Sequence, residues 1–372
     1  MRVPFIDLSR TLGKIKKDVL SDWEHCFDQC EFVGGPGVKI LEDRLQERMG
    51  VSNFVTCANG TDALIVGLLA MGVKPGMRVA VPNMTFWAPY EAIIQVGAVP
   101  VLVDVSDDDL QMDLDEFKSA HEKFRFDAAI LVHLFGWVSS RLREYRHWCR
   151  ENNILLIEDG AQAFDVVSEG ESVYRDAMLG TVSFYPAKVF GGASDGGGIS
   201  SNNGKIAEVV RALCNHGRAG HYTYDYVGFN SRMGGLNARF LGRVLDHMDD
   251  FLESRRAAEA FYQEYFAAHT DLVKVHKAPE GVESNGYLSV ITCLKKSADE
   301  MVAKMRDVGV GCARTYPQTI AYQPPVKNCM RSSDLVRSEA FSKSVINLPL
   351  FAGITLVECE YAADQLLKAL RS

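Results

Sequence analysis

A lysine in a glycine-rich turn is the residue of this chain best suited to covalent chemistry. Lys188 follows Ser183 by five residues, and two glycine runs, Gly191-Gly192 and Gly196–Gly198, come next. A serine can bind a phosphate while a nearby lysine reaches an aldehyde on the same molecule, and partial desolvation makes such a lysine nucleophilic. A single lysine is usually a solvated surface charge. The glycines argue against that interpretation here. The glycines could also suggest a nucleotide-binding loop, but the dinucleotide spacing and the GK[ST] phosphate-loop pattern are absent.

Two adjacent acids end an apolar run. Glu158 and Asp159 follow Ile154–Ile157 directly, and strand alternation places their side chains on opposite faces. A buried carboxylate needs a positive partner. A protonated pyridine nitrogen next to Asp159 would be one, and its charge would make the ring an electron sink. The alternative is a surface acid at a strand end.

Three further places at strand ends suit a flat, anionic ligand. Gly60 and Thr61 open a predicted helix, whose free N–H groups suit a phosphate, although they could form a simple helix cap. Trp87 could stack on a flat ring or fill the core. Asn230 could donate to a phosphate and Arg232 could bind an anion, or this segment could cap the helix that follows.

The elements that must position these residues alternate between short apolar runs and helical patterns. Such alternation indicates βαβ units, and hence an α/β fold with a mainly parallel sheet flanked by helices. Ligands bind at the carboxyl ends of strands in such sheets. The predicted strands are Phe54–Cys57, Arg78–Val81, Val99–Val103, Ala128–His133, Ile154–Ile157, Val182–Tyr185 and Gly198–Ser200.

The pattern changes near Asn237. Apolar residues then recur at helical spacing past Phe261, which predicts one long amphipathic helix. We therefore expect a large domain over residues 1–236 and a smaller α+β domain over residues 237–372. The later elements expected there are a strand over Tyr287–Thr292 and helices over Ala298–Val308 and Leu356–Leu370.

Composition narrows the class of protein. The chain has 372 residues, 47% of them hydrophobic, and a net charge of −8, which argues against a general nucleic-acid binder. Nine cysteines without regular spacing argue against a disulfide framework or a zinc site. The first residues contain no apolar run of signal-peptide length, and no stretch approaches the roughly 20 apolar residues of a membrane span. We expect a cytoplasmic protein without a metal.

The ordered set of motifs resembles the DegT/StrS family of nucleotide-sugar aminotransferases, which are pyridoxal 5′-phosphate (PLP) enzymes of fold-type I. The likeness runs from Phe5-Ile6-Asp7-Leu8 to about Leu350. It includes the segments Phe32–Gly37, Val101–Val105 and His133–Gly136 in addition to the motifs above.

The resemblance implies a role for each matching cofactor residue. Lys188 matches the Schiff-base lysine, and Asp159 matches the acid that binds the pyridine nitrogen. Asn230 matches a residue that reaches the phosphate in the neighbouring subunit, which implies a homodimer with active sites at the interface. The other matches are Gln162 near the phenolic oxygen of the ring, Gly60, Thr61 and Ser183 as phosphate binders, and Trp87 as the stacking aromatic ring.

The substrate side matches less fully. His133 matches a strand-end histidine and is a candidate substrate residue, although a satisfied core histidine is the favoured interpretation. Arg232 and Tyr316 are the other candidates. Family members often carry Tyr-Pro and then a Pro-Leu-His stretch that helps to bind the sugar nucleotide. Here Tyr316 and Pro317 are present but no histidine follows, so the contacts with the nucleotide or sugar are expected to differ.

Three functions follow from these patterns, and the first is favoured. It is a PLP-dependent transaminase that moves an amino group, from L-glutamate by family analogy, to a keto-sugar linked to dTDP, UDP or GDP. The second is a sugar dehydratase, whose relatives replace the lysine with histidine. The third is a catalytically silent PLP-binding regulatory protein, which should have lost Lys188 or Asp159.

Overall fold

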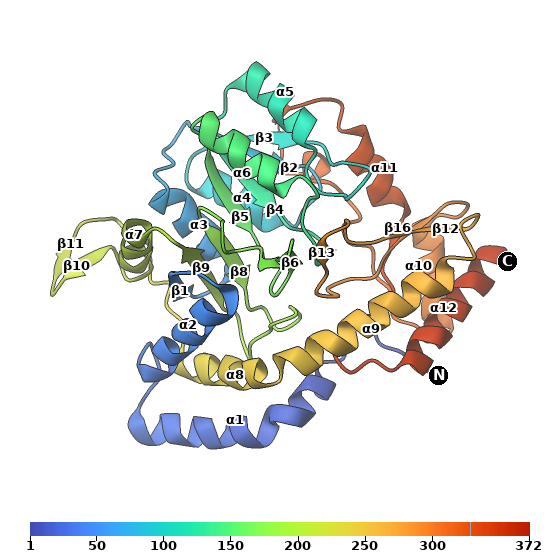
Figure 1. Cartoon of the computed structure of the whole chain (residues 1–372), viewed down its shortest axis with the longest axis horizontal. Coiled ribbons are helices and arrows are strands. Elements are labelled where there is room, and N and C mark those ends of the chain that lie inside the picture. Colours follow the sequence, from blue (N-terminus) through green and yellow to red (C-terminus); the bar gives the residue numbers. More distant parts are fainter. Residues whose placement is uncertain (328) are drawn as a thin grey trace.

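A mainly parallel sheet forms the centre of the protein. The computed structural model describes residues 1–327 and 329–372. Within these residues the large sheet has eight strands in the order β1-β9-β8-β5-β4-β2-β3-β15 (Figure 1). Strand β9 is antiparallel to both of its neighbours, while the other pairings are parallel. The predicted α/β fold class is confirmed.

The strands lie close to their predicted positions. Strand β4 is buried at every residue, as expected for a strand covered on both faces. Strand β8 ends at Ser183, two residues before the predicted end, so that the turn carrying Lys188 begins directly at the sheet edge. The bounds are β1 Asn53–Cys57, β2 Arg78–Pro82, β3 Val99–Val103, β4 Ala128–Val132, β5 Leu155–Asp159, β8 Gly180–Ser183, β9 Gly197–Ser201 and β15 Met330–Arg331.

Helices cover both faces of the sheet and bury two apolar cores. One core contains side chains of α3 (Gly60–Ala70), α4 (Trp87–Gln95) and α7 (Gly204–Cys214). The other contains side chains from helices on the opposite face. These helices are α1 Ser9–Gln29, α2 Pro36–Met49, α5 Leu114–Phe124, α6 Leu142–Glu151 and α8 Gly235–Asp246.

The predicted long helix after Asn237 is two helices. Helix α8 ends at Asp246, His247 leaves helical geometry with φ −115° and ψ 13°, and α9 runs over Met248–Phe266. Each helix buries its own apolar face, and the helical spacing of apolar residues continues across His247. The spacing therefore does not reveal the break between the two helices. Helix α9 packs with a three-stranded sheet and two helices: β12 Val273–His276, β14 Val290–Cys293, β16 Val345–Ile346, α10 Ala298–Asp307 and α12 Leu356–Arg371.

The two expected domains exchange segments across residue 237. Strand β15 from the C-terminal part pairs in parallel with β3 of the large sheet, and Phe341 packs in the core with α3 and α4. Val3 in turn packs in the C-terminal core and bridges to Val310. The division at residue 237 stays a prediction. The remaining short elements are β6 Val167–Ser168, β7 Glu171–Ser172, β13 Val282–Glu283, β10 Arg218–Gly220, β11 Thr223–Tyr224 and η1 Ile320–Tyr322.

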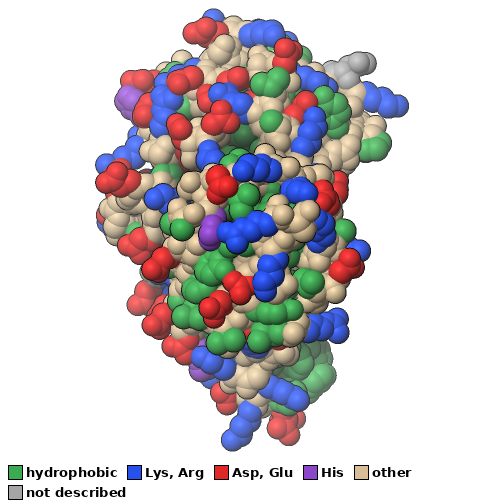
Figure 2. Space-filling view, turned by 90° about the vertical axis from the view of Figure 1, so that its right-hand side faces the viewer, with side chains coloured by type: hydrophobic (Ala, Val, Ile, Leu, Met, Phe, Trp, Pro, Cys, Tyr) green, Lys and Arg blue, Asp and Glu red, His purple; other side chains and the backbone are tan. Residues whose placement is uncertain are grey.

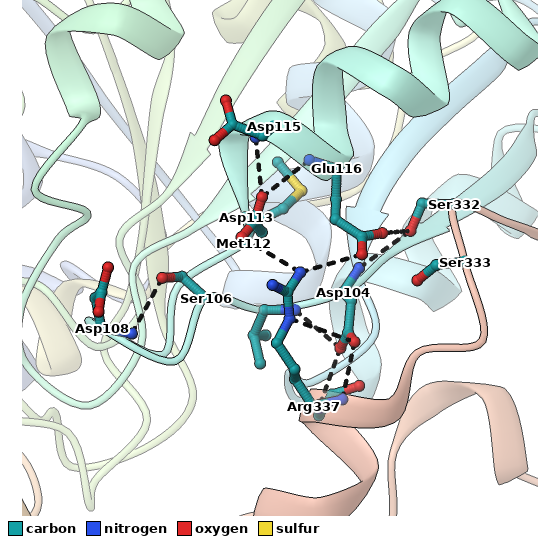
Figure 3. Close-up of polar contacts among 12 residues, drawn as sticks. Asp104, Ser106, Asp108, Met112, Asp113, Asp115, Glu116, Ser332, Ser333 and Arg337 are labelled. Atoms are coloured by element: carbon teal, nitrogen blue, oxygen red, sulfur yellow. Dashed lines mark hydrogen bonds and ion pairs between the residues drawn. The ribbon is translucent and has the colours of Figure 1, made fainter.

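A polar cluster joins the end of β3 to helix α11 (Val336–Ser344), as Figure 3 shows. The buried carboxylate of Asp104 accepts hydrogen bonds from the backbone N–H groups of Arg337 and Ser338, each at 2.9 Å. The Arg337 guanidinium also pairs with Glu116 at 3.1 Å. A carboxylate at a helix N-terminus satisfies free N–H groups and the helix dipole. The cluster therefore fixes α11 to the large sheet.

The surface mixes charges of both signs. In the view of Figure 2, Lys and Arg side chains lie among Asp and Glu side chains, with hydrophobic side chains between them. Within the described residues, no helix is both long enough and apolar enough to cross a membrane.

Candidate active site

The site is a cavity of about 650 Å³ at the carboxyl ends of the parallel strands. Segments from both parts of the chain line it. From the large sheet come strand ends and the turns after them, and from the C-terminal part come α9 and residues near Tyr287 and Tyr316. Seven of the predicted site residues line this cavity: Gly60, Thr61, Asp159, Gln162, Ser183, Lys188 and Tyr316.

Lys188 is held in a tight turn after β8. Its backbone N–H donates to the Tyr185 carbonyl at 2.8 Å. A Cβ at Gly191 would lie 2.3 Å from the Pro186 carbonyl oxygen, so a side chain there would force the turn open. The Nζ atom of Lys188 lies 3.4 Å from the Tyr287 hydroxyl and 5.2 Å from the centre of its ring. The lysine is half-buried and faces the cavity rather than bulk water.

Asp159 is a buried carboxylate at the end of β5 without a cationic partner. Its Oδ1 accepts hydrogen bonds from the Ala161 N–H at 2.9 Å and from the Thr181 hydroxyl at 3.5 Å. No Lys, Arg or His side chain of the described residues forms an ion pair with it, and burial raises its pKa above the ordinary value. A protonated ring nitrogen bound next to it would supply the missing positive charge.

Glu158 points to the opposite side of the strand, as the alternation predicts. It pairs with Arg146 at 2.8 Å and with His133 Nε2 at 3.0 Å. Burial alone would raise the pKa of Glu158, but these two partners outweigh it and hold the pKa at about 2. Glu158 is therefore a satisfied structural acid.

The N-terminus of α3 and the end of β8 form one end of the cavity. Asn59 caps the helix by accepting from the Asp62 N–H at 2.8 Å, which leaves the N–H groups of Gly60 and Thr61 for a ligand. A Cβ at Gly60 would lie 2.8 Å from the Ser183 Cβ. The glycine thus lets the helix start approach Ser183 closely. Helix N–H groups and two hydroxyls make this end suitable for a phosphate.

Gln162 is fixed by two hydrogen bonds. Its Oε1 accepts from the Phe135 N–H at 2.7 Å, and its Nε2 donates to the Tyr316 hydroxyl at 2.7 Å. Burial raises the pKa of Tyr316 well above the ordinary value, which keeps the phenol neutral. The pair joins β5 of the large sheet to the C-terminal part across the cavity.

The stacking role of Trp87 stays a prediction, and the structure places its neighbour Phe86 at the cavity. Helix α4 begins at Trp87, whose ring packs against Tyr90 with 4.9 Å between ring centres. Trp87 is not among the described residues that line the cavity, whereas Phe86 is. Phe86 precedes the first helical turn in extended geometry, and 58% of its surface is exposed. The ring pairs with Tyr316 at 6.3 Å.

Three other predicted residues lie outside the cavity of their own chain. His133 is buried with Nε2 3.0 Å from Glu158, while its Nδ1 has no partner among the described residues, and its role as a substrate residue stays a prediction. Asn230 and Arg232 are exposed and bond to each other, with 2.7 Å between Asn230 Oδ1 and Arg232 Nη2. Within one chain, Asn230 and Arg232 do not reach the site.

Sequence reasoning missed the residues that enter the cavity from α9 and the segment before β14. Arg255 and Tyr287 both line it, next to Lys188. Tyr287 was predicted only as the start of a strand, and Arg255 falls within the span predicted as one long helix without being singled out. No local motif marks either residue, because their place depends on how the C-terminal part packs on the sheet.

Comparison with known proteins agrees with this geometry. The sequence model of the DegT/DnrJ/EryC1/StrS aminotransferase family matches residues 14–367. The chain belongs to this family. The prediction of this family is thereby confirmed.

Relatives in the DegT/DnrJ/EryC1/StrS family cover nearly the whole chain. A UDP-N-acetyl-3-dehydro-alpha-D-glucosamine 3-aminotransferase from Acidithiobacillus ferrooxidans is 30% identical over 94% of this chain and 93% of its own. A pleiotropic regulatory protein from Geobacillus stearothermophilus is 28% identical over 100% and 99%. The crystal structure of a family aminotransferase from Brucella abortus has a TM-score of 0.93 at 28% identity, covering 98% and 99%.

Proposed function

We propose that this protein is a PLP-dependent aminotransferase that moves an amino group from an amino acid, L-glutamate by family analogy, to a keto-sugar linked to a nucleotide. The observation that carries the proposal is the presence of Lys188 and Asp159 in one cavity. Both residues line it, and Asp159 is a buried carboxylate that forms no ion pair among the described residues. The transaminase relative above supports the sugar-nucleotide substrate class.

The residues of the cavity fit PLP. Lys188 would bond to the aldehyde of the cofactor, Asp159 would pair with its ring nitrogen, and Phe86 would stack on the ring. Solved structures with this fold occur in PLP and PMP forms. The residues for the phosphate would be Gly60, Thr61 and Ser183, and the residue for the phenolic oxygen would be Gln162. When bound, the cofactor supplies a protonated aromatic ring that accepts electrons from the carbon next to the amine.

Lys188 would have two roles in the reaction. Its amine would hold the cofactor through the aldehyde, and once released it would serve as the base and acid that moves a proton at the substrate carbon. The Tyr287 hydroxyl, 3.4 Å from Nζ, keeps the lysine oriented in the cavity. Gln162 and Tyr316 hold their hydrogen bond at the cavity wall, which limits how the ring can shift.

Asp159 contributes through its charge. Burial raises its pKa in the protein alone, and a cationic ring nitrogen would lower the pKa again and keep the carboxylate ionised. The carboxylate in turn favours the protonated ring. The low exposure of Asp159, 4%, means that water screens this pair weakly.

We further propose that the protein is a cytoplasmic homodimer with shared active sites. The segment of β10, β11 and the following loop extends from the chain with exposed aromatic and apolar residues, among them Tyr222 at 73% and Val227 at 97% exposure. Exposed apolar surface of this kind is typical of an interface. In the dimer, Asn230 would reach the phosphate bound to the partner, and Arg232 would supply an anion contact there.

Two alternatives are not favoured. A sugar dehydratase of this family would carry histidine where this chain has Lys188. A silent regulatory protein, a role that the name of the Geobacillus relative suggests for that relative, would not need both Lys188 and Asp159 in one cavity.

The test is covalent trapping of the cofactor. Borohydride reduction of the purified holoprotein followed by peptide mass spectrometry should place the cofactor on the peptide with Lys188. The yellow absorbance of the unreduced protein should disappear with L-glutamate and return with a suitable nucleotide-linked keto-sugar. A Lys188→Ala protein that turns over normally, or a label on another lysine, would refute the proposal.

A further inference from the structure

Arg255 is a buried cation without an acidic partner. It lies on α9 with 6% of its surface exposed. Its Nη1 donates only to backbone carbonyls, those of Gly286 at 3.2 Å and Leu350 at 3.5 Å. Its Nε is buried and has no acceptor among the described residues. Burial lowers the pKa of Arg255 to about 10, so the guanidinium stays charged at neutral pH.

A buried arginine of this kind is unusual, because desolvation of its charge is normally offset by a carboxylate. Arg146 shows the usual arrangement, since it pairs with Glu158 through two nitrogens. For Arg255 the described residues provide no carboxylate within ion-pair distance, and its named acceptors are two backbone carbonyls. The guanidinium therefore has unused capacity to bind an anion.

The position of Arg255 limits which anion it can bind. Arg255 and Lys188 both line the main cavity, and both also line a smaller cavity of about 310 Å³ next to it. Tyr287 contacts Lys188, and it directly follows Gly286, whose carbonyl accepts a hydrogen bond from Arg255. The predicted phosphate site is instead built by α3 and β8. An anion bound to Arg255 would therefore lie near Lys188 and not at the phosphate end of the cavity.

We propose that Arg255 binds the α-carboxylate of the amino donor. The inference rests on the proposed transaminase function. In an α-amino acid, the carboxylate is attached to the carbon that carries the reacting amine, so it must lie near Lys188 whenever the amine does. A planar guanidinium with free N–H groups matches a carboxylate through two parallel hydrogen bonds. Arg255 is then a specificity residue for amino acids over simple amines.

The experiment separates the two half-reactions of the holoenzyme. In single-turnover absorbance measurements, Arg255→Gln should lower kcat/KM for L-glutamate by about 10²-fold, mostly through KM, because one charged hydrogen-bonding partner is lost. The half-reaction with the keto-sugar acceptor should stay unchanged. Arg256→Gln is the matched control, since Arg256 lies next on the same helix and its guanidinium donates to the Ser284 and Asp165 carbonyls.

Amides of the donor identify the carboxylate. Wild-type enzyme should react better with the γ-amide of glutamate than with its α-amide, and Arg255→Gln should lose this preference. Calorimetric titration with glutarate adds a readout that needs no turnover, and its binding should weaken in Arg255→Gln only. If Arg255→Gln does not fold, Arg255→Lys should keep the preference for the γ-amide while raising KM for glutamate.

The outcomes are distinct for the two proposals. Wild-type holoenzyme that reacts with no amino acid would refute the transaminase function. Wild-type enzyme that reacts, with Arg255→Gln keeping both the rate and the amide preference, would refute the role of Arg255 alone. Equal losses in the donor and acceptor half-reactions would also refute it, because they would show a structural role or a contact with the sugar nucleotide.

Discussion

The two sides of the β5 strand end hold buried carboxylates in opposite states. On one side, Glu158 is 1% exposed and pairs with Arg146 and His133. On the other side, Asp159 is 4% exposed and accepts hydrogen bonds from one backbone N–H and one hydroxyl without any ion pair in the described structure. The folded chain supplies the opposite charge for Glu158, whereas for Asp159 the proposed cofactor would have to supply it.

The same difference separates two arginines. Arg146 stabilises the core side of the sheet through Glu158, while Arg255 on the cavity side has backbone carbonyls only. The burial of a charge therefore says little about its role. Whether the chain itself supplies the opposite charge distinguishes a structural residue from a binding residue.

Replacing Asp159 should have the largest effect. Asp159→Asn keeps the shape but removes the charge that would face the ring nitrogen, so kcat should fall on the order of 10²–10³-fold. The protein without cofactor should be at least as stable as wild type, because an unpaired buried charge is removed. Single-turnover kinetics and thermal unfolding measure the two effects. Normal kcat in Asp159→Asn would contradict the comparison.

Replacing Glu158 should affect stability instead. The folded pKa of Glu158, about 2, lies below its ordinary value of 4.5, so the carboxylate contributes stability above pH 4.5 that is lost as the pH falls toward 2. Glu158→Gln should lower the free energy of unfolding by about 3 kcal/mol at neutral pH.

Denaturant unfolding across this acid range measures the contribution of Glu158. The wild-type protein should lose stability there and Glu158→Gln should lose less, while kcat of the folded variant stays near wild type. A variant with normal stability and low kcat would reverse the roles assigned to the two acids.

A larger side chain at the phosphate end of the cavity should weaken binding of the cofactor without unfolding the protein. Gly60→Ala places a Cβ 2.8 Å from the Ser183 Cβ, and overpacking of this kind costs about 2 kcal/mol, or roughly 30-fold in affinity for the cofactor. Fluorescence titration of the apoprotein with PLP gives the dissociation constant. Ser183→Ala is a useful companion, since it loses a hydroxyl but adds no bulk. Unchanged affinity for PLP in both variants would show that the phosphate binds elsewhere.

The smallest expected effect separates Phe86 from Trp87. Phe86→Leu should weaken PLP binding by about 1 kcal/mol, the contribution of one aromatic stack. Trp87→Leu should leave PLP affinity unchanged and lower thermal stability, because that ring packs against Tyr90. Equilibrium titration and thermal unfolding of both variants check this pair. A larger loss of PLP affinity in Trp87→Leu would favour the predicted stacking role of Trp87.

Site residues could be predicted from the sequence where a single strand determines the position of a residue. Asp159 and Ser183 are the last residues of β5 and β8, Lys188 follows β8, and the carboxyl ends of parallel strands meet at one edge of the sheet. Their presence in one cavity could therefore be predicted without side-chain geometry. The choice between Phe86 and Trp87 could not be predicted in this way, because it depends on the exact start of a helix, which a short apolar segment encodes poorly.

The residues from the C-terminal part could not be predicted in the same way. Arg255 and Tyr287 reach the cavity through packing between separate elements, and no hydrogen-bonded register ties them to β5 or β8. The break at His247 was hidden for a similar reason, because the apolar period continues through it. The role proposed for Asn230 could not be read from one chain either, because Asn230 is exposed there and would act only in the proposed homodimer.

The polar cluster at Asp104 has a consequence for how the cavity can open. Two backbone N–H groups of helix α11 donate hydrogen bonds to the Asp104 carboxylate at the end of β3, and β15 pairs in parallel with β3. A hinge that swung all residues after 237 away as one body would have to break these bonds in the middle of the fold. We therefore expect the β15–α11 segment to keep its contacts with the large sheet when a bulky sugar nucleotide enters. Any conformational change would be confined to the elements around this segment.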